Sequence, residues 1–214
     1  MSSRLAQLAR PAPAPGPAAA AAAAERCDLC GEPVAPRHRH LVDLDERRVL
    51  CACRACTLLL DRPAAGGGGG GGRLRLIPTR RRRLDALQLD AAAWARLRLP
   101  VELAFLFHSS AAGRTVAVYP SPLGATESTL ALDAWDELVA SEPALAELEP
   151  DVEALLVCRA HGLDERWLMP IDDCYALVGA LRTRWRGFGG GAEAWQAIER
   201  FFEDLDRRAR EERR

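Results

Sequence analysis

The sequence contains no lysine and almost no net charge. All 29 basic residues of the 214-residue chain are arginines, and 30 acidic residues bring the formal net charge to -1. Because a near-neutral chain carries no strong overall field, net charge does not recruit nucleic acid or an anionic membrane. The missing lysine and the runs of alanine and glycine indicate a GC-rich genome, so an individual arginine is weak evidence for bidentate recognition.

A long apolar run is also missing. No stretch of about 20 strongly apolar residues occurs, and we therefore expect no membrane span. Residues 1–25 combine four prolines with a run of alanines and lack the leucine-rich core of a secretory signal. We expect a disordered arm here. Without an export signal the expected compartment is cytoplasmic, where cysteines stay reduced.

Cysteine, by contrast, is concentrated near the amino end. Five of the seven cysteines lie within residues 27–56, at positions Cys27, Cys30, Cys51, Cys53 and Cys56. A C-x-x-C pair can place both sulfurs on one ion, because the intervening turn folds back and Gly31 lets the backbone tighten. The two pairs at this spacing predict a metal site made of Cys27, Cys30, Cys53 and Cys56.

Three nearby residues leave the ligand set open. Cys51 is expected beside the bound sulfurs, and His38 or His40 is a candidate to replace one of them. Structural zinc is the favoured ion. The alternatives are a rubredoxin-like iron or an iron-sulfur cluster, because paired C-x-x-C units indicate a metal but select the ion weakly. A disulfide framework would need an oxidising compartment.

We predict a small module followed by a larger body, in the α+β class. A hairpin over residues 40–50 and a helix starting near Leu58 give the module a zinc-ribbon or treble-clef character. The predicted divisions are a disordered arm (1–25), the metal-binding module (26–62), a glycine-rich linker (63–72), an α+β domain (73–208) and a charged tail (209–214). The glycine run lacks the Lys-Ser or Lys-Thr of a phosphate-binding loop.

In the body, period and turn signals predict antiparallel hairpins and carboxyl-terminal helices. We expect a strand at 74–77 that opens the body, and hairpins at 103–119 and 154–170. We expect a loop at 120–128. Helices are expected to begin at the caps Asp90, Asp133 and Asp172, and a last helix to present residues 195–205 on one side. The six arginines from Arg73 to Arg83 are predicted to lie in a solvated loop rather than an anion-docking patch.

No arrangement typical of catalysis is present. His108, His161, Ser121 and Ser128 have no acid, base or nucleophile at a recognisable spacing, so we predict no catalytic residues. Cys158, His161 and Cys174 have ligand-like spacing, but they lack an obvious fourth donor. We expect the two thiols to be buried as small apolar groups.

The sequence resembles an uncharacterised domain-of-unknown-function family of high-GC Gram-positive bacteria. The resemblance covers most of residues 27–205. It rests on Cys27-x-x-Cys30, His38-Arg39-His40-Leu41, Cys51-Ala52-Cys53-x-x-Cys56, the run from Tyr119 to Ser128, and Pro170-Ile171-Asp172-x-Cys174-Tyr175. Genes for such proteins often lie near those for NiFe hydrogenases. The resemblance therefore implies an accessory role beside a hydrogenase or its maturation machinery, and it supplies no catalytic residues.

The leading functional prediction is a non-catalytic, metal-binding accessory protein that docks on a protein partner. A rubredoxin-like iron electron carrier is the first alternative, since four thiolates also hold iron. A nucleic-acid-binding zinc ribbon is the second. It is disfavoured because no aromatic residues are interleaved with the arginine run.

Overall fold

The computed structural model describes residues 25–60, 72–99, 101–121, 124–128, 135–186 and 190–212. The predicted arm before Glu25, the linker up to residue 71, and the helix signals at Pro100 and Asp133 lie outside these ranges. The α+β class is confirmed: antiparallel sheets combine with five α-helices over the described part of the chain.

The body is built on a six-stranded antiparallel sheet with the order β4-β9-β8-β5-β6-β7. Both predicted hairpins form, the first from β5 and β6 and the second from β8 and β9. The strands are β4 (Arg82–Arg83), β5 (Leu103–Ser109), β6 (Arg114–Ser121), β7 (Gly124–Ser128), β8 (Glu153–Cys158) and β9 (Glu165–Pro170).

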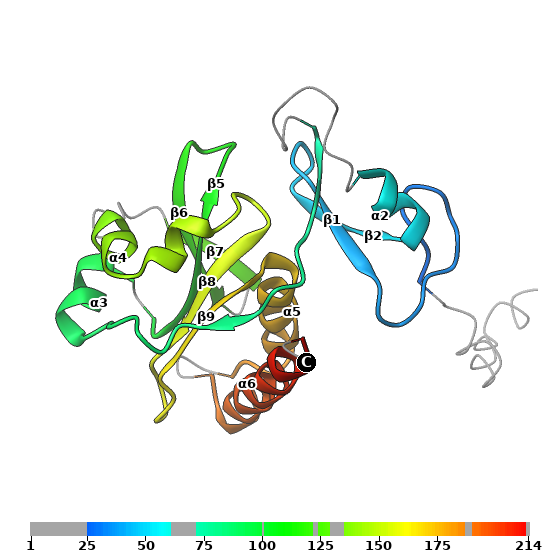
Figure 1. Cartoon of the computed structure of the whole chain (residues 1–214). Coiled ribbons are helices and arrows are strands. Elements are labelled where there is room, and N and C mark those ends of the chain that lie inside the picture. Colours follow the sequence, from blue (N-terminus) through cyan, green and yellow to red (C-terminus); the bar gives the residue numbers. More distant parts are fainter. Residues whose placement is uncertain are drawn as a thin grey trace, which may run out of the picture.

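Helices cover both faces of this sheet (Figure 1). Since successive strand residues point to opposite faces, β8 divides its side chains between two cores. Leu156 belongs to the core beside α5 (Ile171–Arg182) and α6 (Ala192–Glu212). Leu155 and Val157 belong to the core beside α3 (Ala91–Leu97), α4 (Trp135–Ser141) and the 3-10 helix η2 (Pro143–Glu147). This two-sided burial explains why β8 is apolar without alternation, as the sequence predicts.

The predicted N-cap residue is correct for one helix and wrong for another. Asp90 caps α3 as predicted, because its side chain accepts a hydrogen bond from the Ala93 amide at 2.7 Å. The predicted cap Asp172 is wrong. Helix α5 follows β9 without a loop and begins at Ile171 after Pro170, so Asp172 lies inside the first turn. Helix α6 continues to Glu212 and buries Ala209 beyond the predicted end of the body.

The predicted loop at 120–128 is wrong at both of its ends. Strand β6 continues to Ser121, and Gly124–Ser128 forms the edge strand β7 paired with it. Glycine, serine and glutamate have low strand propensity, but pairing along an existing sheet edge outweighs that preference. The hydroxyl-rich segment is therefore part of the sheet.

The amino-terminal module contains its own three-stranded sheet, with the order β2-β1-β3. Its elements are β1 (Arg39–Asp43), β2 (Arg48–Ala52), α2 (Arg54–Leu60) and β3 (Leu74–Leu76). The strand predicted at 74–77 forms, but it pairs with β1 and does not join the large sheet. A knuckle, a hairpin and a helix follow one another in the order of a treble clef.

A buried carboxylate fixes the turn between β1 and β2. The Asp43 side chain is 2 % exposed and accepts three hydrogen bonds from Arg73, including one from Nη2 at 2.7 Å. Hydrogen bonds from Arg73 hold the pKa of Asp43 down at about 2, against the opposing effect of burial. This pair joins the hairpin to the residue that precedes β3.

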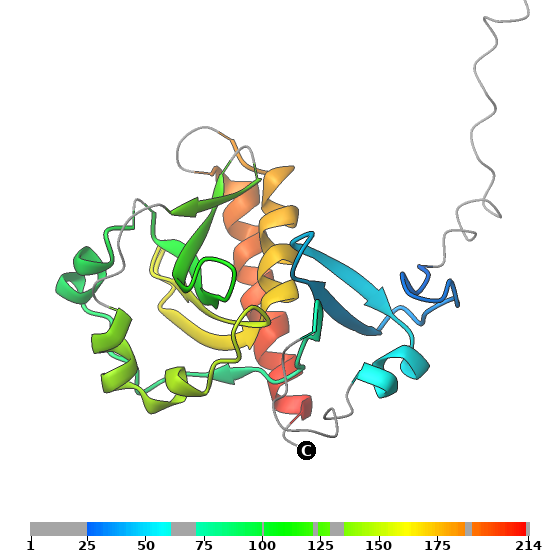
Figure 2. The ribbon, with the colours of Figure 1, turned by 90° about the horizontal axis from the view of Figure 1, so that it is seen from above.

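The module contacts the body through one side of its hairpin (Figures 1 and 2). Val42 packs against the core beneath α5, and the imidazole Nδ1 of His40 lies 2.6 Å from a carboxylate oxygen of Asp172. Arg47 pairs with Glu127 on β7. Among the helices in the described ranges, none combines the length and apolar character needed to cross a bilayer.

Candidate metal centre

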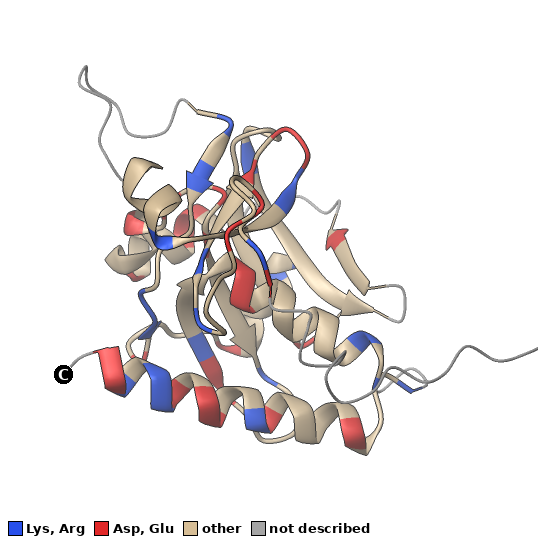
Figure 3. Cartoon of the chain, turned by 90° about the vertical axis from the view of Figure 1, so that its right-hand side faces the viewer, with Lys and Arg blue, Asp and Glu red and all other residues tan. Residues whose placement is uncertain are grey.

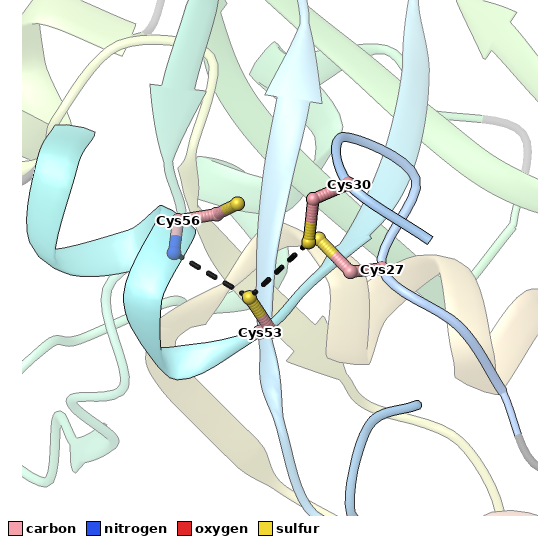
Figure 4. A group of neighbouring side chains, drawn as sticks. All are labelled: Cys27, Cys30, Cys53 and Cys56. Atoms are coloured by element: carbon pink, nitrogen blue, oxygen red, sulfur yellow. Dashed lines mark hydrogen bonds between the residues drawn. The ribbon is translucent and has the colours of Figure 1, made fainter. Parts of the chain in front are cut away.

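Two short segments carry the four predicted sulfur ligands. Cys27 and Cys30 lie in the knuckle, where the Gly31 amide donates to the Cys27 carbonyl at 2.8 Å and Gly31 adopts φ 78°. That backbone conformation favours glycine. Cys53 immediately precedes α2 and Cys56 lies in its first turn, so the helix presents both sulfurs toward the knuckle (Figure 4).

The four sulfurs converge. All four lie within 4.8 Å of one another, and the Sγ atoms of Cys30 and Cys53 are 3.7 Å apart. Four sulfurs at the usual zinc–sulfur distance of about 2.3 Å around a tetrahedral ion are separated by about 3.8 Å. A disulfide needs about 2.05 Å, and all seven cysteines are free. The geometry fits a tetrahedral ion, and the cluster is able to bind a metal.

The thiols of the cluster differ in their pKa values. Burial opposes ionisation of Cys27, but the backbone amides of Cys53, Leu29 and Cys30 outweigh it and lower the pKa of the thiol to about 6. Hydrogen bonding to Cys53, followed by burial, raises the pKa of Cys56 to about 12. At neutral pH Cys27 is therefore available as a thiolate ligand. Cys56 keeps its proton until a bound cation compensates the negative charge.

The knuckle is fastened to the hairpin by Asp28. The Cys51 amide donates to the Asp28 side chain at 2.6 Å, and the Asp28 amide donates to the Cys51 carbonyl at 2.9 Å. In addition, the Cys56 amide donates to the Cys53 sulfur at 3.5 Å, as at a helix N-cap. Backbone groups thus hold both ligand segments in place.

The three alternative ligands lie elsewhere. Cys51, His38 and His40 are outside the group of four sulfurs and form a group of their own, again with ligand atoms within 4.8 Å of one another. Burial, followed by the charges of Glu25 and Asp28, raises the pKa of Cys51. The sequence predicted these residues as substitutes within one site. It missed their separate grouping, although His-x-His opposite Cys across a hairpin was a usable signal.

The remaining candidates lie apart from the cysteine cluster. Cys158 and Cys174 are buried in the core beneath α5, and burial raises the pKa of both thiols, that of Cys158 to about 11. The His161 ring stacks on Trp195 with centroids 3.8 Å apart. His108 is exposed at the end of β5. These residues form no ligand group within the described part of the chain.

The arginine run forms ion pairs rather than a free basic patch. Arg80 contacts Glu153, Arg81 contacts Asp173 and Glu212, and Arg83 contacts Asp85 and Glu165. On the face shown in Figure 3, acidic and basic residues alternate along α6 and elsewhere. The predicted solvated loop is wrong for Arg81, whose side chain is 12 % exposed, and for Arg82 and Arg83, which form strand β4.

One comparison with known proteins gives a match. The model described as "Family of unknown function (DUF5947)" covers residues 26–209, from the knuckle almost to the end of α6. Neither a curated protein nor a solved structure matches the chain. The predicted membership of an uncharacterised family is confirmed, while the bacterial group and the gene neighbourhood stay predictions. The chain belongs to the family of unknown function DUF5947.

Proposed function

We propose that this protein is a non-catalytic accessory protein that holds a structural zinc ion on Cys27, Cys30, Cys53 and Cys56 and docks on a protein partner. The partner we propose is a NiFe hydrogenase or its maturation machinery, as the family resemblance implies. The convergence of four thiol sulfurs carries the proposal, because zinc sites closed by four protein ligands are typically structural.

The small core of the module supports a folding role for the ion. Its fully buried hydrophobic cluster consists of Leu41, Leu50 and Ala52, with Leu74 and Leu76 packed against it. A segment with so little buried apolar surface rarely folds alone, and metal binding then supplies folding free energy. Zinc would add no redox chemistry at this position.

Exposed leucines support a docking role. In the described residues, every exposed large hydrophobic side chain lies in the module, and Leu58 and Leu59 on α2 are 59 % and 71 % exposed. Helix α2 lies on the side of the module away from the large sheet (Figures 1 and 2). Burial of such a side chain against a partner is worth about 1.5–3 kcal/mol.

An iron electron carrier is the second candidate. The exposed thiol of Cys30 would bring a bound iron close to the surface, where a redox partner could approach. The nucleic-acid alternative has lost its main support, because Arg80, Arg81 and Arg83 are engaged by carboxylates.

Elemental analysis of protein purified without added metal distinguishes zinc from iron. We expect colourless protein that contains zinc, and we expect the double substitution Cys30→Ser and Cys56→Ser to remove the ion of the cluster and unfold the module. Cys158→Ala, which alters a buried thiol of the body, is the matched control and keeps the metal. A red protein with thiolate-to-iron absorption supports the carrier instead.

Docking is tested with a purified NiFe hydrogenase or its maturation proteins. Replacing Leu58 and Leu59 with serine should weaken binding by roughly 100-fold or more, since each loses at least about 1.5 kcal/mol of burial. Arg54→Ala alters an exposed residue of the same helix and should leave binding unchanged. Equal affinity of the leucine variant and the wild type would remove α2 from the interface.

A further inference from the structure

We propose that His38, His40 and Cys51 form a second metal site, separate from the four-cysteine cluster, which binds a zinc-class ion through two imidazole nitrogens and one thiolate. One ligand atom from each residue lies within 4.8 Å of those of the other two. None of the three belongs to the four-sulfur group. The proposal therefore concerns a set of ligands different from the one on which the proposed function rests.

The hairpin places these residues on one face. His40 on β1 is the direct cross-strand partner of Cys51 on β2, so their side chains project to the same side of the sheet. His38 precedes His40 by two residues, which returns its side chain to that side. The two imidazole rings meet edge to face, with centroids 4.6 Å apart and planes at 72°.

His38 supplies a nitrogen that nothing else engages. Its side chain is only 7 % exposed, and its Nδ1 lies 2.8 Å from the carbonyl oxygen of Ala35. A carbonyl oxygen only accepts, so Nδ1 carries the proton and the neutral ring presents a lone pair at Nε2. This Nε2 is buried and has no hydrogen-bond partner among the described residues. A buried polar atom without a partner is costly, and a bound cation would satisfy it.

His40 is oriented in a similar way. Its Nδ1 lies 2.6 Å from an oxygen of Asp172 on α5, which leaves Nε2 as the nitrogen for a metal. Ligating histidines typically donate their other nitrogen to a carboxylate or a carbonyl, which fixes the ring and its tautomer. Asp172 is this partner for the Nδ1 of His40, and the Ala35 carbonyl is the partner for the Nδ1 of His38. A simple ion pair would explain His40, but it would not explain the buried Nε2 of His38 or the position of Cys51.

The donor set indicates the class of ion. Two imidazoles and a thiolate suit zinc and the neighbouring divalent transition metals, whereas calcium and magnesium prefer oxygen. Three protein ligands leave one tetrahedral position for water or another small ligand. A groove of about 510 Å³, lined by His38, His40, Asp172 and Asp173 among others, gives an ion a path to the two histidines.

A cobalt titration of the full chain tests the proposal. Metal-free, reduced protein is titrated with Co²⁺, whose thiolate charge-transfer absorption reports sulfur ligands. We expect two equivalents per chain in the wild type. His38→Gln, His40→Gln and Cys51→Ala should each retain one, and His108→Ala, which alters an exposed histidine remote from the group, should retain two. Near-UV circular dichroism checks that each variant is folded.

The proposal is decided by the wild-type stoichiometry together with that of the variants that stay folded. A single equivalent that persists in folded His38→Gln, His40→Gln and Cys51→Ala overturns the second site and leaves the proposed function intact. That result would mean that water, and not a metal, satisfies His38. Two equivalents that persist in folded His38→Gln and Cys51→Ala also overturn it. Two equivalents that fall to one in these variants support it, whether or not the four-cysteine cluster proves to hold zinc.

Discussion

At the scale of single residues, hydrogen-bond donors decide which of the buried thiols has a lowered pKa. Cys27 is buried among backbone amides that favour its thiolate, whereas Cys158 and Cys174 are buried among apolar side chains that disfavour theirs. The same desolvation therefore accompanies a lowered pKa in one case and raised pKa values in the others. The difference lies in the hydrogen-bond donors, which the sequence signals only through the C-x-x-C-Gly pattern.

Stability should fall at alkaline pH because of Cys158. Burial raises the pKa of its thiol from 9.0 to about 11, so between these values the folded chain holds a proton that the unfolded chain has released. Under linkage, stability then decreases as pH rises, and it is fully present only below the unfolded pKa. Relative to Cys158→Ala, the wild type should lose about 2 kcal/mol of unfolding free energy between pH 8 and pH 11. Denaturant unfolding of both proteins at these pH values measures this, and parallel curves would contradict it.

The carboxylate of Asp172 should tune metal affinity at the second site. Asp172→Asn keeps the size of the side chain but removes the charge that orients His40. Loss of such a partner typically weakens metal binding by about 10- to 100-fold. Cobalt affinity should fall by this factor for the equivalent that requires Cys51, and it should stay constant for the four-cysteine cluster. Asp164→Asn, at an exposed carboxylate in the turn before β9, is the control.

At the scale of elements, hydrophobic periodicity and capping residues predicted helices and strands that depend on neighbouring residues. They did not predict strand pairings that depend on residues far away in the sequence. Asp90 signals α3 because its side chain bonds an amide three residues away. The strand at 74–77 could also be predicted, but its partner β1 could not, because nothing in its own residues selects one strand over another. Likewise β7 carries weak strand formers, and only its pairing with β6 makes it a strand. The grouping of the two C-x-x-C pairs could be predicted, because ligands of one metal ion need a fixed spacing along the chain.

The segment before β4 should be held mainly by Arg80. Its guanidinium donates to both oxygens of Glu153 at 2.6 and 2.7 Å, and this carboxylate at the start of β8 is fully buried. The Glu149 amide donates to it as well, at 3.0 Å.

Removal of the arginine leaves the buried Glu153 carboxylate without its cationic partner. Arg80→Ala should cost about 1–3 kcal/mol of unfolding free energy, because the Arg80 side chain is 42 % exposed and water can take its place. Arg82→Ala, two residues away and exposed, should stay within about 0.5 kcal/mol of the wild type. Chemical denaturation compares the two, and equal effects would show that the Glu153 pair does not support the fold.

At the scale of the whole molecule, the module and the body differ in what stabilises them. The body buries two apolar cores on opposite faces of its sheet, whereas the module has a few buried side chains and the cysteine cluster. The contacts between them include a hydrogen-bonded His40–Asp172 pair, the Arg47–Glu127 pair and the packing of Val42. Such a contact is too small to fold the module without its metal, but it couples the two parts once both are folded.

A chelator should therefore unfold the module and leave the body intact. All five tryptophans lie between residues 94 and 195, so their fluorescence reports the body alone. After metal removal we expect amide protection to be lost over β1, β2 and β3, because the sulfurs no longer share a cation and the three-stranded sheet has little other core. The tryptophan emission maximum should stay unchanged, and hydrogen exchange should remain slow in β5 and β8, which are buried on both faces. If β8 lost protection together with β1, the module and the body would form a single cooperative unit, and the metal would support the whole fold rather than the amino-terminal part.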